Sequence, residues 1–180
     1  MSKYDVTIIG SGPGGYVAAI RCAQLGFKTA LIEKYDVLGG TCLNVGCIPS
    51  KALLDSSHHY HDATHTFEKH GIDIKGEITP NLAQMISRKA EVVSQTTGGI
   101  NFLMDKNKVY VIHGFGSFID KNTIKVTKAD GEVTINTDKV IIATGSKPNF
   151  VPGMEPDKDR IITSTEALTL KEIPENLIII

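Results

Sequence analysis

The first third of the chain alternates between short apolar runs and one helical pattern. Residues 5–9 and 28–33 have the character of short buried strands. Between them, residues 14–25 carry apolar side chains at helical spacing, and Gly26 stands where a helix would end. A strand, a glycine-rich turn, a helix and a second strand together predict a βαβ unit, which requires a parallel sheet.

Two longer helical segments follow. A glycine- and cysteine-bearing loop is predicted over 38–47, followed by a helix over 51–69 with Pro49 in its first turn, where proline is tolerated. A second helix is predicted from residue 81 to about residue 105. The pair Gly98-Gly99 predicts that this helix is interrupted or ends early.

The pattern changes to β after residue 106. Residues 109–112 are strand-like, and 123–127 and 133–137 alternate apolar and polar positions around a hairpin signal at Asp130-Gly131. Residues 140–143 then have the character of a further buried strand. We therefore expect a small antiparallel β-meander inserted into a parallel α/β fold.

The last part of the chain has a different character. Residues 147–156 contain three prolines and predict a linker, and 163–166 fit a capping box that opens a short helix. The run 177–180 consists of four large aliphatic residues, which is typical of a buried parallel strand. We expect two parts, a nucleotide-binding domain over 1–146 and, over 147–180, a linker with the first elements of a second domain, cut off at its first strand.

Composition narrows the possible partners. Of the 180 residues 41% are hydrophobic, and 19 basic residues balance 20 acidic ones, so no excess charge favours nucleic acid or an anionic membrane. No signal-peptide pattern or apolar span of membrane length is present. We therefore expect a soluble cytoplasmic protein without nucleic-acid or membrane partners. Its cysteines should be reduced unless they are catalytic or redox-sensing.

A glycine-rich motif follows the first strand. Gly10, Gly12 and Gly15 form the pattern G-x-G-x-x-G, which permits a tight turn, close approach of a pyrophosphate and close packing of helix on sheet. Glu33 ends the next strand and can accept hydrogen bonds from a ribose. This context favours nucleotide binding over a simple tight turn, and the motif alone does not distinguish FAD from NAD.

Two cysteines lie just before the next helix. Four residues separate Cys42 from Cys47. A structural disulfide that closes so short a loop would remove little chain entropy, and a cytosolic setting disfavours one. Zinc sites use more ligands at shorter intervals. Thiols at helix N-termini ionise more readily, so a redox-active pair is the better interpretation.

The segment GGTCLNVGCIPSK at 39–51 resembles the redox-active disulfide signature of the class I pyridine nucleotide–disulfide oxidoreductases. Glutathione and mercuric reductases belong to that family. Leu43, Ile48 and 50–54 are most similar to its dihydrolipoamide-oxidising branch. The similarity extends along the whole chain and includes 114–116 and 143–146. It implies a Rossmann-like FAD-binding domain, truncated at the start of an NAD domain.

The resemblance also implies roles for individual residues. Cys42 corresponds to the thiol that exchanges with the substrate, and Cys47 to the thiol that faces the flavin. Lys51 corresponds to the lysine beside flavin N5, Glu33 to the residue that holds the adenosine ribose, and Gly116 to a backbone contact near the adenine. The full set of cofactor-binding candidates is Gly10, Gly12, Pro13, Gly14, Gly15, Glu33, Lys34, Gly40, Thr41, Lys51, Gly116, Thr144, Gly145 and Ser146.

The activity that the resemblance implies is oxidation of dihydrolipoamide to lipoamide through the Cys42–Cys47 disulfide and FAD, with NAD⁺ as final acceptor. The implied partners are lipoyl groups of 2-oxoacid dehydrogenase or glycine cleavage complexes, and the implied parent is a homodimer. We expect the NAD site to lie outside these residues, and the chain alone to bind FAD weakly without full turnover. Alternatives are a reductase of the glutathione or mercuric type and an inert nucleotide-binding fragment.

Two other features have simpler interpretations. Cys22 is expected to be a buried small hydrophobe within the first helix. His58, His61 and His65 share a helical face by spacing and could bind a metal. A solvated helix surface is favoured, because no carboxylate or cysteine completes an obvious site. We predict no metal centre.

Overall fold

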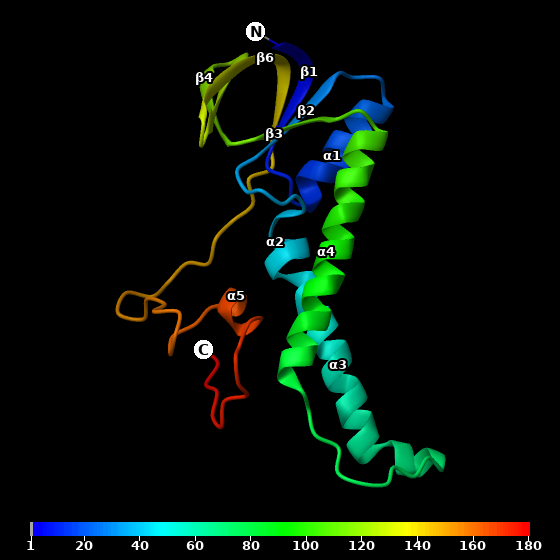
Figure 1. Ribbon diagram of the computed structural model, residues 1–180. Coiled ribbons are helices and arrows are strands. Elements are labelled where there is room, and N and C mark those ends of the chain that lie inside the picture. The colour runs from blue at the N-terminus through cyan, green and yellow to red at the C-terminus, as the bar shows by residue number, and fades with distance from the viewer. Residues whose placement is uncertain (1) are drawn as a thin grey trace. The chain divides into compact units, whose positions relative to one another are not determined.

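The computed structural model describes residues 2–180, which form two compact units. The first unit consists of the residues up to Asn44 together with Gln95–Lys147, and the second consists of Val45–Ser94 together with Pro148–Ile180. All the strands belong to the first unit, which therefore contains the sheet (Figure 1).

One six-stranded sheet organises the first unit, in the order β3-β2-β1-β6-β5-β4. Neighbours from β3 to β6 pair in parallel, and β6, β5 and β4 pair antiparallel. The strands are β1 (Ser2–Ile9), β2 (Thr29–Glu33), β3 (Tyr110–His113), β4 (Phe115–Asp120), β5 (Thr123–Lys128) and β6 (Gly131–Ile142). The predicted α/β class, with a parallel sheet plus an antiparallel meander, is confirmed.

The first βαβ unit has the predicted form. Helix α1 (Pro13–Gln24) begins directly after the glycine turn, with a proline in its first turn, and it returns the chain to β2. In the parallel register, Val6 lies opposite Thr29 and Ile9 opposite Ile32. Every residue of β2 is buried, as a strand with neighbours on both sides requires.

Strand β6 differs from the prediction of two separate strands over 133–137 and 140–143. It is continuous, and it pairs antiparallel with β5 through its first half and parallel with β1 from Ile135 to Ile142. The polar residues in between conceal this continuity in the sequence. Thr137 is buried and donates its hydroxyl proton to the carbonyl of Lys139, whereas Asp138 forms an exposed ion pair with Lys3.

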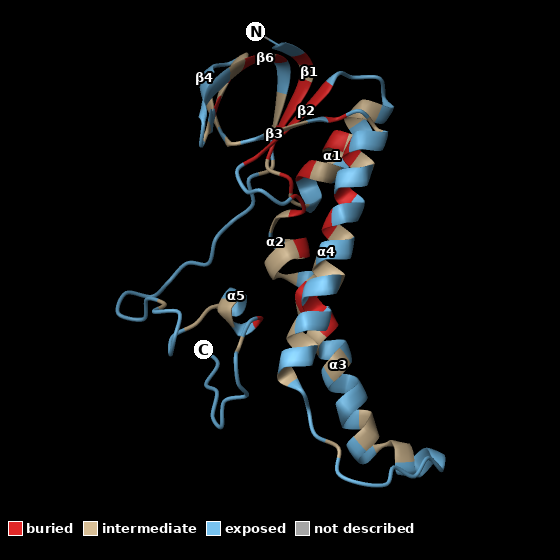
Figure 2. Ribbon diagram, viewed as in Figure 1, coloured by how far each residue is buried: buried red, intermediate tan, exposed pale blue. Residues whose placement is uncertain are grey.

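The meander covers one face of the parallel strands. Buried side chains from β1 and β2 form a core cluster with buried side chains from β5 and β6, namely Tyr4, Ile9, Ala30, Ile32, Ile124, Val126 and Ile135. The sheet therefore curls, which Figure 1 shows as the rounded arrangement of β4 and β6 around β1. The other face lies against α1, where Gly15 approaches Ile8. Figure 2 shows β1 and β2 largely buried, with a further buried stretch on α1.

Helices dominate the second unit. These are α3 (Cys47–His65), the 3-10 turn η1 (Phe67–His70) and the first half of α4 (Leu82–Lys106). The predicted 38–47 loop is wrong over most of its length, because Gly40–Val45 form the short helix α2 and α3 already begins at Cys47. The predicted interruption at Gly98-Gly99 is also wrong, since α4 continues through both glycines.

The last residues confirm one prediction and correct another. Helix α5 (Ser164–Ala167) opens with a complete capping box between Thr163 and Glu166. Residues 177–180, in contrast, form no strand, and Ile180 is 96% exposed. A buried parallel strand needs neighbours to pair with, and none of the strands in residues 2–180 pairs with this run. No helix within residues 2–180 combines the length and apolar character needed to cross a membrane.

Candidate functional site

The glycine turn after β1 is shaped by close backbone contacts. Gly10 has a φ of +100°, and a Cβ atom at this position would collide with the carbonyl of Ala143. A Cβ atom on Gly15 would collide with the carbonyl oxygen of Gly10. The Gly10 amide donates to the Ile32 carbonyl over 2.8 Å, which anchors the turn to β2. Glycine is therefore required at both ends of the motif by the protein itself.

Gly12 is different, because its surroundings leave room. A Cβ atom here would meet only the Cα of Gly40, at 3.9 Å, and the φ of −64° suits any L-residue. No side chain of the described residues caps α1, and Pro13 stands in its first turn. The backbone at this helix N-terminus is thus open to an anionic group, with the positive end of the helix dipole behind it.

Glu33 lies at the end of β2 and is only 5% exposed. Its Oε2 accepts hydrogen bonds from the backbone N–H and the hydroxyl of Ser11, at 2.8 and 2.6 Å. Its Oε1 accepts one from the amide of Tyr35, at 3.0 Å. Because a carboxylate oxygen can accept two hydrogen bonds, Oε1 retains capacity for a ribose hydroxyl.

Other candidates surround this turn at the carboxyl ends of the strands. Gly116 on β4 lies over the parallel strands, since a Cβ there would be 3.3 Å from Ile32 and 3.4 Å from Ile9. The amide of Ala143 donates to the Ile9 carbonyl, and the chain then leaves β6 through Thr144. Ligands of open α/β sheets bind beyond this edge. Along one edge, the fold thus gathers candidates that are far apart in the sequence.

The remaining candidates of the first unit fall into two groups. Gly40 packs on Gly12, where a Cβ would lie 2.6 Å from the Gly12 Cα, so its role is to let two backbone segments approach. Most of the others are solvent-accessible and show no contact that assigns a role. They are Pro13, Gly14, Lys34, Thr41, Gly145 and Ser146.

The two cysteines lie on successive helices. Cys42 is half-buried in α2, and Cys47 is exposed as the first residue of α3, with Gly46 alone separating the helices. No side chain among residues 2–180 caps α3 at its N-terminus. Lys51 follows Cys47 by one helical turn, so the thiol and the ammonium group share a face of α3. An exposed thiol and an ammonium group thus lie one helical turn apart on α3.

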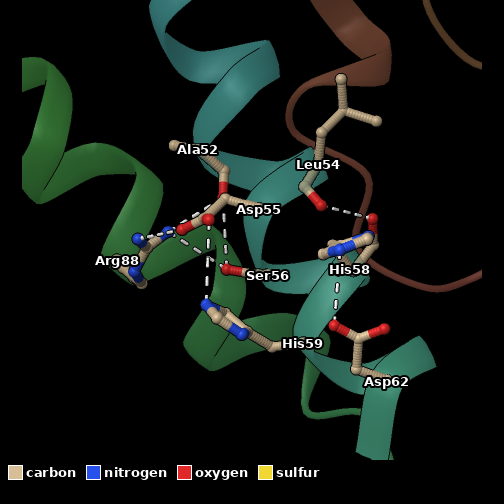
Figure 3. Close-up of polar contacts among 9 residues, drawn as sticks. Ala52, Leu54, Asp55, Ser56, His58, His59, Asp62 and Arg88 are labelled. Carbon is tan, nitrogen blue, oxygen red and sulfur yellow. Dashed lines mark hydrogen bonds and ion pairs between the residues drawn. The ribbon is translucent and has the colours of Figure 1, made fainter. Parts of the chain in front are cut away.

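A polar clamp holds α3 to α4 within the second unit. Figure 3 shows Arg88 of α4 reaching α3, where it donates to the carbonyl of Ala52 over 2.9 Å and to Asp55 Oδ2 over 2.7 Å. The same guanidinium donates to the hydroxyl of Ser56 over 3.2 Å. The clamp fixes the turn of α3 that follows Lys51.

Sequence reasoning missed both Ser11 and Arg88. Ser11 is fully buried, and its hydroxyl accepts from the Gly39 amide over 3.2 Å while it donates to Glu33. A small hydroxyl residue inside the glycine motif is a signal that could have directed attention to it. Arg88 has no such signal, because its partners lie more than thirty residues away in the sequence.

The features given simpler interpretations also have clear positions. Cys22 is half-buried, so the prediction of a buried residue is wrong. His58 and His61 are exposed on α3, as predicted for a solvated face. A carboxylate does lie beside them, since Asp62 Oδ2 is 3.3 Å from His58 Nε2. Residues 2–180 contain no group of three or more His, Cys, Asp and Glu side chains arranged to hold a metal ion.

Comparisons with known proteins agree with this geometry. The sequence model of the pyridine nucleotide-disulphide oxidoreductase family matches residues 4–180. The chain is 54% identical over 178 residues to the mitochondrial dihydrolipoyl dehydrogenase of Mesocricetus auratus, covering 98% of this chain and 37% of that protein. The enzyme of Pisum sativum is 53% identical and is covered to 35%. The chain thus spans about a third of the length of these relatives.

A solved structure shares the fold as well. A Cu(II) complex of the HOCl-induced flavoprotein disulfide reductase RclA from Escherichia coli is 32% identical and superposes with a TM-score of 0.75, covering 97% of this chain and 36% of the other.

The comparisons correct one prediction. The similar dihydrolipoyl dehydrogenases are named as mitochondrial, so the predicted cytoplasmic location is wrong. The prediction rested on composition, charge and the lack of a signal-peptide pattern or membrane-length apolar span, and none of these identifies the organelle. The match over residues 4–180, together with the fold, also answers the question of family. The chain belongs to the pyridine nucleotide-disulphide oxidoreductase family.

Proposed function

We propose that this chain forms the FAD-binding and dithiol-bearing part of an enzyme that oxidises dihydrolipoamide to lipoamide, with NAD⁺ as final acceptor. The observation that carries the proposal is Cys47, exposed at the uncapped N-terminus of α3, with Cys42 on the helix just before it. The identity of 53–54% to dihydrolipoyl dehydrogenases supports the choice of substrate.

The residues of the first unit fit FAD. Members of this family bind FAD and use a pyridine nucleotide. The open backbone at Gly12 and the N-terminus of α1 suit a pyrophosphate, and Glu33 Oε1 suits the adenosine ribose. Gly116, which packs against Ile32 and Ile9, would contact the adenine region through its backbone. Thr144, Gly145 and Ser146 would line the cofactor where the chain leaves β6.

The cysteines would carry out thiol–disulfide exchange. One thiolate of dihydrolipoamide attacks Cys42 of a Cys42–Cys47 disulfide, which breaks the S–S bond and leaves Cys47 as the thiolate. The second substrate thiol then displaces Cys42 from the mixed disulfide. Lipoamide is released oxidised, and both cysteines are left reduced, so two electrons and two protons have moved. Lys51, one turn from Cys47, would stabilise negative charge on that face of α3.

When bound, FAD supplies the electron transfer that returns the dithiol to a disulfide and passes a hydride to NAD⁺. We propose that residues 1–146 form the FAD domain and that residues 147–180 form a linker and the first elements of the NAD domain. The proposed partners are lipoyl groups of 2-oxoacid dehydrogenase or glycine cleavage complexes, and the proposed assembly is a homodimer.

The likeness to RclA supports a second candidate, a flavoprotein disulfide reductase that acts on another substrate. The two candidates differ in which dithiol reacts. Dihydrolipoamide should reduce the Cys42–Cys47 disulfide much faster than glutathione does if the first proposal is right, because its two thiols complete the exchange intramolecularly.

FAD binding can be tested with one methyl group. Gly12→Ala adds a Cβ with no close protein neighbour, so the fold should be unchanged. The methyl would occupy the space proposed for the pyrophosphate and weaken FAD binding by at least about tenfold, or about 1.4 kcal/mol. Quenching of flavin fluorescence on titration with the chain measures this affinity. Gly98→Ala, on an open position of α4, is the matched control.

Equal FAD affinity in Gly12→Ala and wild type would refute the proposed pyrophosphate position. An absence of FAD binding by the wild-type chain would refute its role as a cofactor-binding unit. The dithiol can be tested in the same way. Cys42→Ser and Cys47→Ser each remove the Cys42–Cys47 disulfide, so neither variant should gain thiols when it is treated with dihydrolipoamide. Counting the protein thiols before and after the reaction measures this.

A further inference from the structure

One face of α3 carries four side chains that can bind or neutralise a cation. His58, His61, Asp62 and His65 occupy positions i, i+3, i+4 and i+7, which lie along one stripe of a helix. The side chains of His58 and His61 are 74% and 62% exposed. Figure 3 shows His58 and Asp62 one above the other on α3. The stripe lies beyond the turn that bears Cys47 and Lys51, and the proposed function does not use it.

His61 and His65 form a close pair within this stripe. Their rings are stacked, with centroids 4.6 Å apart and planes inclined by 11°. Two histidines at i and i+4 on one helix are the arrangement that binds zinc in helical metal motifs. Metal–nitrogen bonds of about 2.0–2.1 Å place two ligand nitrogens roughly 3 Å apart, so metal binding requires both side chains to rotate until their Nε2 lone pairs point to one ion.

The local hydrogen bonds leave the outer ring nitrogens available. The Thr64 hydroxyl lies 2.9 Å from the Tyr60 carbonyl and can donate its one proton there. It then accepts from His65 Nδ1, at 2.7 Å, and this nitrogen also lies 3.2 Å from the His61 carbonyl. A proton on Nδ1 leaves the Nε2 lone pair of His65 free to bind a metal.

The environment of His61 is similar. Its Nδ1 lies 3.8 Å from Asp62 Oδ1, so that carboxylate faces the inner ring nitrogen. Histidines that bind metals usually donate their second ring N–H to a carbonyl or carboxylate, which fixes the tautomer and strengthens the ligand. His65 Nδ1 has a carbonyl within hydrogen-bond distance, whereas the carboxylate nearest to His61 Nδ1 lies at 3.8 Å and would have to move closer to accept that proton.

We propose that His61 and His65 chelate a divalent transition-metal ion through their Nε2 atoms, with Asp62 as the outer carboxylate. No third protein ligand stands ready among residues 2–180, so water completes the coordination. Imidazole ligands select Cu²⁺, Ni²⁺ and Zn²⁺ over Mg²⁺ and Ca²⁺, which prefer oxygen. Among these ions, Cu²⁺ should bind most tightly.

The proposal can be tested by titrating the 180-residue chain with Ni²⁺ and recording NMR spectra of the imidazole protons. Ni²⁺ is chosen because it does not oxidise thiols. The paramagnetic ion should broaden the His61 and His65 signals first. His61→Ala and His65→Ala should each weaken binding at least about tenfold, since the second imidazole otherwise binds intramolecularly. Both positions are exposed, so neither change should disturb folding.

Two controls separate this site from others. His59→Ala removes an equally exposed histidine that pairs with Asp55 instead, and it should leave Ni²⁺ binding unchanged. The double variant Cys42→Ser/Cys47→Ser should also bind normally, because the proposed site uses no thiol. Three results would each overturn the proposal. These are an unchanged Ni²⁺ affinity in His65→Ala, a loss of affinity in His59→Ala as large as that in His65→Ala, and a loss of Ni²⁺ binding in the double cysteine variant. None of these outcomes depends on FAD binding.

Discussion

Removing the Ser11 hydroxyl tests how the glycine turn after β1 is held together. Ser11 is fully buried, and its hydroxyl both donates to Glu33 and accepts from the Gly39 amide. A hydrogen bond to a charged group contributes about 1.5–3 kcal/mol. In Ser11→Ala, the Ser11 backbone N–H still bonds Glu33, and the Gly39 amide still bonds the Ser11 carbonyl. No buried group is left unpaired, so the loss should be near 1.5 kcal/mol.

Hydrogen exchange of the β1 and β2 amides, followed by NMR, measures this loss in the unit that contains the turn. A loss of about 1.5 kcal/mol should accelerate exchange roughly tenfold at Ile8 and Leu31. Ser57→Ala is the matched control, because the Ser57 hydroxyl lies exposed on α3 and alanine is favoured in helices. Exchange in Ser11→Ala as slow as in Ser57→Ala would refute the argument that this hydroxyl stabilises the turn.

Three further changes have defined outcomes. Arg88→Ala removes the clamp to Ala52. Because the guanidinium is partly exposed, the free energy of unfolding should fall by about 1 kcal/mol, measured by urea unfolding of α3. An unchanged free energy would show that the clamp is not stabilising. Gly98→Ala should instead raise helix stability by about 0.5–1 kcal/mol, since its Cβ meets nothing, and a decrease in the thermal midpoint would contradict this. Hydrogen bonds from Thr163 lower the pKa of Glu166. The capping box should therefore be intact above the ordinary glutamate pKa and be lost as the pH falls through the lowered pKa. The chemical shift of the Thr163 amide in an NMR pH titration should follow this loss.

Local patterns were sufficient wherever a feature depends on neighbours in the sequence. The glycine turn, α1 and the capping box at Thr163 were all predicted, because each arises from residues within one or two helical turns. The predicted break in α4 was wrong because the local pattern did not decide this feature. A glycine pair lowers helix propensity by about 2 kcal/mol at most, and contacts elsewhere along the 25 residues outweigh that penalty.

The sequence by itself determined the fold class, the glycine-rich turn and the spacing of Cys42 and Cys47, since periodicity, glycine placement and residue identity are local properties. Tertiary structure alone decided that one strand, β6, serves both the parallel sheet and the meander, because its pairing with β1 joins residues more than a hundred positions apart. It also decided that Ser11 fixes Glu33 and that Arg88 fixes α3. Arg88 has no local pattern, and the roles of both side chains exist only once segments distant in the sequence are packed together.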